Sequence, residues 1–60
     1  MNMKVQSLTR AFDIVELLST EQHGMALTEI AERLGLPQST VYRLLSSLKE
    51  RGYVEQTERN

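Results

Sequence analysis

The chain has 60 residues and a formal net charge of −1, with seven Lys and Arg against eight Asp and Glu. This length allows at most one small domain, which would bury only about 60% of its unfolded surface. The absence of cysteine excludes disulfides, thiol catalysis and Cys-based zinc sites. No apolar run follows Lys4 or approaches the roughly 20 residues of a membrane span, so we expect a cytoplasmic protein with neither signal peptide nor membrane segment.

The first predicted helix covers residues 8–19, with Ser7 as its N-cap. Ile14 and Leu17 widen its apolar arc to more than half of the circumference, although a surface helix needs only about 100°. These two residues either pack against a later part of the domain or meet a second copy of this helix, which would make it a dimerisation element. Five other apolar residues are predicted to face the core: Leu8, Ala11, Phe12, Val15 and Leu18.

Arg10 lies near the start of this helix, and it is either a solvated surface charge or a contact to a DNA phosphate. A polar stretch follows and ends in Gln-His-Gly, which indicates a turn at residues 22–24. His23 is the only histidine, so with no cysteine beside it we expect no metal site. Residues 25–27 form a short apolar run that is predicted to be a single short strand.

Residues 27–46 are predicted to form a helix-turn-helix, two helices joined by a tight turn. Ile30, Ala31 and Leu34 recur at helical spacing, and the small Ala31 lets the two helices cross closely. Gly35 ends this apolar face, at a position where a positive φ is wanted. Thr28 is predicted to cap the helix of this first half.

The third predicted helix begins at about Pro37 and stops at Gly52. Its apolar face consists of Val41, Leu44, Leu45 and Leu48. The opposite side is rich in Ser, Thr and Gln, of which Ser and Thr are poor helix formers. Such a face either only keeps the domain soluble or contacts DNA. A helix selected only for solubility would carry Glu and Lys there.

Several of these polar side chains could read base edges in a major groove. Arg43 can donate two hydrogen bonds to guanine, Gln38 can pair with adenine, and Thr40 offers a methyl group to thymine. The predicted DNA contacts are Arg10, Thr28, Gln38, Ser39, Thr40, Tyr42, Arg43, Ser46, Ser47 and Lys49. Residues 37–52 carry a charge of about +2, whereas most acids lie elsewhere, so we expect a modestly basic recognition helix that binds weakly as a single copy.

Residues 53–56 alternate loosely and are predicted to form the first strand of a hairpin whose tip is 57–60. A strand needs a partner for its backbone groups, so it either pairs with residues 25–27 or has lost its partner. The predicted fold is therefore mainly α, a three-helix winged helix-turn-helix with a short β element and an incomplete wing. We expect residues 1–60 to be one domain and the N-terminal fragment of a longer protein.

Four segments together resemble the N-terminal DNA-binding domain of IclR-type bacterial transcription regulators. They are residues 7–11 (SLTRA), 27–31 (LTEIA), 35–45 (GLPQSTVYRLL) and 52–54 (GYV). The likeness covers nearly the whole chain, and the GLPxSTxxRLL run is its most specific part. The missing last strand and the slightly negative charge are departures from the family's pattern.

The resemblance implies a dimer or tetramer that binds a roughly palindromic operator in double-stranded DNA. It implies that the third predicted helix enters the major groove and that the first predicted helix pairs two DNA-binding domains. By the same resemblance Ser39, Thr40, Tyr42 and Arg43 would contact DNA, with Arg10 on a phosphate. It also implies a C-terminal domain, absent from this chain, that binds a small-molecule effector, often an organic acid.

Two other classes of function are an interaction module and an enzyme. The chain could be a winged-helix module that docks a protein or an RNA, a possibility that its net negative charge favours. DNA binding through basic side chains should instead weaken steeply with salt. We expect no enzyme and no cofactor, because the sequence shows no paired carboxylates, no Gly-rich phosphate loop and no nucleophile with a nearby base.

Overall fold

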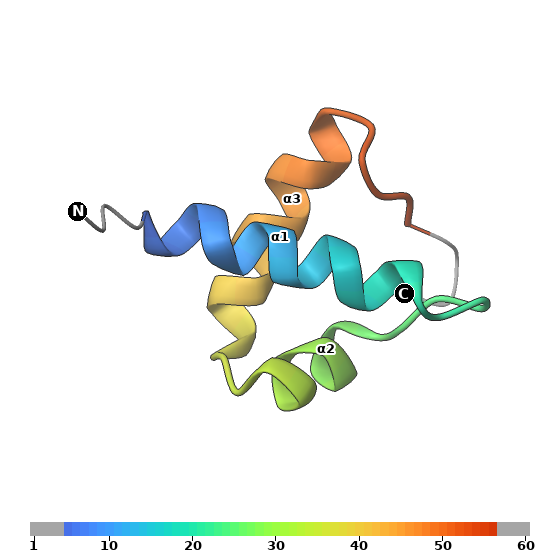
Figure 1. Cartoon of the computed structure of the whole chain (residues 1–60), viewed down its shortest axis with the longest axis horizontal. Coiled ribbons are helices and arrows are strands. Elements are labelled where there is room, and N and C mark those ends of the chain that lie inside the picture. Colours follow the sequence, from blue (N-terminus) through green and yellow to red (C-terminus); the bar gives the residue numbers. More distant parts are fainter. Residues whose placement is uncertain (1–4, 57–60) are drawn as a thin grey trace.

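The computed structural model describes residues 5–56, which form three helices and no strand. They are α1 (Gln6–Ser19), α2 (Leu27–Leu34) and α3 (Gln38–Glu50) (Figure 1). Each helix contacts the other two. The long α1 crosses α3, and a tight turn joins α2 to the start of α3 (Figure 1). The predicted helix-turn-helix fold is confirmed.

The core takes one fully buried side chain from each helix. Ile14 of α1 and Val41 of α3 have 0% of their surface exposed, and Ile30 of α2 has 1%. Met25 and Ala31 complete the buried cluster. Half-buried side chains surround it: Leu17, Leu18, Leu27, Leu34, Leu36, Leu44, Leu45 and Leu48. Each fully buried aliphatic side chain contributes about 1.5–3 kcal/mol, so these few positions account for much of the stability.

The side of α1 that faces the core differs in part from the prediction, since Leu18 packs against the core as predicted but two other residues do not. Leu8 and Phe12 were expected to be buried, but 55% and 57% of their surfaces are exposed. The helix is rotated so that Ile14 points inward, and Phe12 lies on the opposite side of the helical circumference. The N-terminal part of α1 also extends past α2 and α3, so no other helix covers it (Figure 1).

The predicted N-caps of the first two helices are wrong. α1 follows Val5 and α2 follows Ala26, and neither of these residues makes a side-chain capping bond. Ser7 and Thr28 lie one residue inside their helices, so their side chains cannot act as N-caps. Water can satisfy the free N–H groups of an exposed helix start, which removes the need for a polar cap.

Glycine ends both helices of the helix-turn-helix, as predicted. Gly35 has a φ of 68°, and the N–H of Leu36 donates to the carbonyl of Ala31 at 3.0 Å. Gly52 has a φ of 85°, and the N–H of Tyr53 donates to the carbonyl of Leu48 at 2.9 Å. Each of these bonds belongs to a Schellman motif, in which a residue with a left-handed backbone follows the helix and the next N–H donates to a carbonyl of the last turn.

We expect Gly35→Ala to lower the free energy of unfolding by about 1–2 kcal/mol, the cost of a left-handed backbone for a residue with a Cβ. No atom lies within 4 Å of the added Cβ, so the loss would come from the backbone and not from a clash. Urea unfolding measures it, with Gly35→Asn as the control because Asn tolerates this conformation better. Equal midpoints for wild type and Gly35→Ala would contradict the assigned role of Gly35.

Neither predicted strand forms in the described residues. Met25 is buried in the core, and Leu27 is already the first residue of α2. Residues 53–56 follow α3 as bends and coil. Within residues 5–56 they have no second strand to pair with, and an isolated strand leaves its backbone groups unsatisfied. The predicted hairpin tip at 57–60 lies outside the described residues.

Candidate nucleic-acid interface

The outer face of α3 is an exposed surface that carries mostly polar side chains. Val41 anchors the inner side of this helix in the core, which turns the side chains half a turn away toward solvent. Ser39, Tyr42, Arg43 and Ser46 are all exposed there, Tyr42 to 63%. None of these four makes a side-chain hydrogen bond or ion pair with another described residue. Their donors and acceptors are therefore available to a ligand.

The start of α3 follows the end of α2 after a short turn. Thr28 and Gln38 line one shallow depression that runs along the turn between the two helices. The other residues in its wall are Ala31, Glu32, Gly35 and Leu36. Thr28 and Gln38, both predicted DNA contacts, therefore border the same depression. Thr40 is only half-exposed, which leaves less of its methyl group accessible than predicted.

The C-terminal end of α3 carries a second shallow depression, lined by Ser46, Ser47, Lys49 and Glu50. The Nζ of Lys49 donates a hydrogen bond to Oε1 of Gln56 at 2.8 Å. This bond ties the segment after α3 to the helix without neutralising the charge of Lys49. Sequence reasoning gave no signal for the contact.

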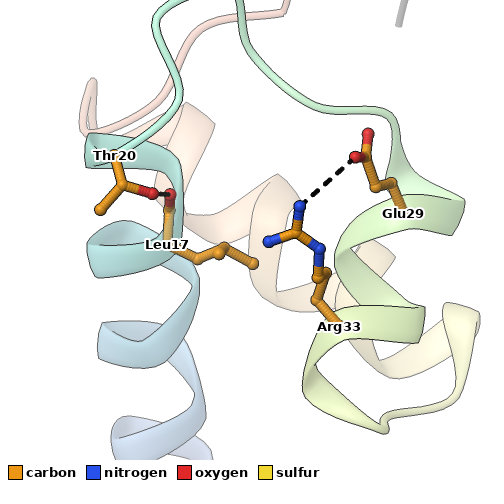
Figure 2. Close-up of polar contacts among 4 residues, drawn as sticks. All are labelled: Leu17, Thr20, Glu29 and Arg33. Carbon is orange, nitrogen blue, oxygen red and sulfur yellow. Dashed lines mark hydrogen bonds and ion pairs between the residues drawn. The ribbon is translucent and has the colours of Figure 1, made fainter.

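The cations are distributed unequally between the helices. Arg33 of α2 forms an ion pair with Glu29, one turn earlier, with Nη2 and Oε2 3.9 Å apart (Figure 2). This exposed pair contributes at most about 1 kcal/mol, but it balances the charge of Arg33 within α2. Arg43 is exposed and makes no such pair in the described part of the chain, whereas Arg10 on α1 is half-buried.

The predicted dimerisation residues have different environments. The side chain of Ile14 is fully buried within the single chain, so packing inside the domain is the alternative that holds for it. Leu17 is half-buried against the same core. A further apolar set lies at the surface, because Val5, just before α1, and Leu8 and Phe12 within it are 60%, 55% and 57% exposed, whereas sequence reasoning placed Leu8 and Phe12 in the core. Their spacing of three and four residues was the available signal for a shared face.

The polar loop before α2 takes no part in these surfaces. The end of α1 is closed locally, since Oγ1 of Thr20 donates to the carbonyl of Leu17 at 2.7 Å (Figure 2). His23 is exposed in the turn that follows. Between residues 5 and 56, no three His, Cys, Asp or Glu side chains are grouped as a metal site would need. No helix in that range has both the length and the apolarity to cross a bilayer.

A polar and basic face on the second helix of a helix-turn-helix is the arrangement by which such units bind the major groove. The fold and this face together define a DNA-binding helix-turn-helix domain. The family profile of the IclR helix-turn-helix domain matches residues 7–58. The chain belongs to this family of DNA-binding domains of transcription regulators, which confirms the resemblance found in the sequence.

Curated proteins similar to the chain are named as regulators. The chain is 43% identical over 53 residues to "Transcriptional repressor IclR" of Escherichia coli (strain K12), which covers 88% of the chain and 19% of that protein. It is 41% identical to "HTH-type transcriptional regulator TtgV" of Pseudomonas putida, over 85% of the chain and 20% of the relative. It is 38% identical to "Glycerol operon regulatory protein" of Streptomyces coelicolor, over 93% of the chain and 22% of that protein.

The chain therefore spans about a fifth of the length of these relatives. No solved structure matches the chain.

Proposed function

We propose that the chain is the sequence-reading domain of a longer bacterial transcription regulator that acts in the cytoplasm. In this proposal α3 lies in the major groove of a roughly palindromic operator, and two copies bind its two half-sites. The observation that carries the proposal is the exposed face of Ser39, Tyr42, Arg43 and Ser46, whose polar groups have no partner in the described residues. A face kept only for solubility would have no need of an arginine beside so many hydroxyls.

The proposed contacts divide into two kinds. Arg43 would read a guanine edge, and Gln38 an adenine edge near the start of α3. Hydroxyl groups at Thr28, Ser39, Ser46 and Ser47 would position the helix on phosphates or bases, together with Tyr42 and the methyl of Thr40. Arg10 and Lys49 would contact phosphates, where each neutralised phosphate makes binding more sensitive to salt.

The proposed dimer uses the exposed apolar side of α1. Val5, Leu8 and Phe12 are exposed in the single chain, so a second copy can approach them without disturbing the core. These residues replace the buried Ile14 as the proposed dimer contacts. Leu17 stays a predicted dimer contact beside them. Tetramers and an effector-binding C-terminal domain remain part of the proposal for the whole protein.

We expect the double substitution Leu8→Lys and Phe12→Lys to abolish pairing of these domains while leaving the fold intact, because both side chains are exposed in the single chain. Affinity for a palindrome should then fall to that of one half-site, as measured by titration of a labelled duplex. Gln22→Lys, at an exposed turn position, is the control for added charge. Unchanged affinity in the double variant would place the dimer contact elsewhere.

Selection from a pool of random duplexes at moderate salt, with the full-length regulator, tests the proposed function. Enrichment of a palindrome whose half-sites lie about one helical turn apart is the expected result. Absence of any enrichment, with no binding even at low salt, would overturn the proposal. That outcome would favour a module that docks a protein or an RNA.

A further inference from the structure

The last residue of α3, Glu50, is an acid on the same side of the helix as the proposed DNA contacts. At 3.6 residues per turn, Glu50 lies within about 20° of Arg43 and Ser39 on the helical circumference. Its side chain is exposed, and it lines the depression that also contains Ser46 and Lys49. An acid on this side is unexpected, because it faces the ligand that the neighbouring residues would bind.

Nothing in the described structure neutralises this carboxylate. The ion pair in residues 5–56 is that of Arg33 with Glu29, and the neighbouring Lys49 donates its hydrogen bond to Gln56. Glu50 makes no hydrogen bond or ion pair with a described residue. It also occupies the C-terminal end of a helix, where the helix dipole disfavours a negative charge. Within residues 5–56 no polar contact of Glu50 therefore stabilises the fold.

The distance along α3 decides what this carboxylate would meet. Glu50 is seven residues beyond Arg43, which is about 10.5 Å along the helix axis at 1.5 Å per residue. The major groove is about 12 Å wide, so with Arg43 on a base edge the end of α3 reaches the phosphates at the groove border. A carboxylate at that point is repelled by the phosphates, whatever the base sequence.

We propose that Glu50 limits the affinity of this domain for DNA in general, so that stable binding requires the base contacts of an operator. The inference rests on the proposed placement of α3 in the major groove. A sequence-independent repulsion lowers affinity for operator and random duplex by the same factor. It lowers the occupancy of the large excess of non-specific sites without changing the ratio of operator to non-specific affinity, which is set by the base contacts made through Arg43.

The test compares Glu50→Gln with wild type in the full-length regulator, by titration of a selected operator duplex and a scrambled duplex over a range of salt. Loss of one repulsion should raise affinity about twofold to fivefold for both duplexes at low salt. The gain should shrink at higher salt, because ions screen the repulsion. The substitution keeps the size of the side chain and removes an unfavourable charge from a helix end, so the fold should persist.

Asp13→Asn is the matched control, since it removes one negative charge at an exposed position on α1. An equal gain in this control would show an effect of net charge alone and would overturn the proposal. So would unchanged affinity in Glu50→Gln, or a loss confined to the operator, which would make Glu50 a reader of a cytosine. If wild type binds neither duplex, the proposed function itself fails, a result distinct from all of these.

Discussion

Replacing Arg43 with Ala is expected to weaken binding to the preferred duplex by about 1–3 kcal/mol and to relax the choice of base at one position of each half-site. Arg43 is exposed, makes no ion pair with a described residue, and lies midway along the outer face of α3. A guanidinium in this place can donate two parallel hydrogen bonds to one guanine, which no other side chain on the face can do. Binding titrations with a set of singly altered duplexes measure both effects.

Arg33→Ala is the control for the loss of a positive charge. Arg33 forms its ion pair within α2, so its removal should weaken binding far less and should leave the base preference unchanged. If Arg43→Ala retained both the affinity and the preference of wild type, α3 would not read the groove in the proposed way. A uniform loss on all duplexes would instead make Arg43 a phosphate contact.

The substitution Ile14→Ala is expected to lower the free energy of unfolding by about 2–5 kcal/mol. Ile14 is fully buried between helices, and the small core offers little freedom to close the cavity. A domain of 60 residues has a total stability of only about 3–9 kcal/mol, so the variant should lose a large share of it. Circular dichroism during urea unfolding measures this loss.

Phe12→Ala is the matched comparison, because it removes a larger apolar side chain from an exposed position on the same helix. At protein concentrations too low for pairing, it should change the unfolding midpoint little. A small effect of Ile14→Ala, combined with a large effect of Phe12→Ala in dilute solution, would reverse the assignment of the inner and outer sides of α1.

The helix-turn-helix was predictable because several independent features of the sequence agree there. Ile30 and Ala31 fall on one helical face, and Gly35 supplies the left-handed residue that the turn requires. The apolar residues after Pro37 recur at helical spacing, and Val41 among them is buried as expected. The exposure of Arg43 and Ser39 follows from the same spacing, so much of the candidate site was predictable too.

The orientation of α1 was not predictable in the same way. More than half of its circumference is apolar, so periodicity allowed either the Leu8–Phe12 side or the Ile14 side to face inward. Packing against α2 and α3 selects Ile14, a choice that only tertiary contacts make. The contact of Lys49 with Gln56 depends on the path of the chain beyond Gly52, which local sequence does not specify.

The separation of the outer face of α3 from the rest of the fold has an evolutionary consequence. Ser39, Tyr42, Arg43 and Ser46 support neither the core nor the turn, which depend on Val41 and on the backbone of Gly35. Substitutions on this face therefore carry little penalty in stability. A duplicated gene could acquire a new operator by changing these side chains alone, so that one scaffold diversifies into regulators of different genes.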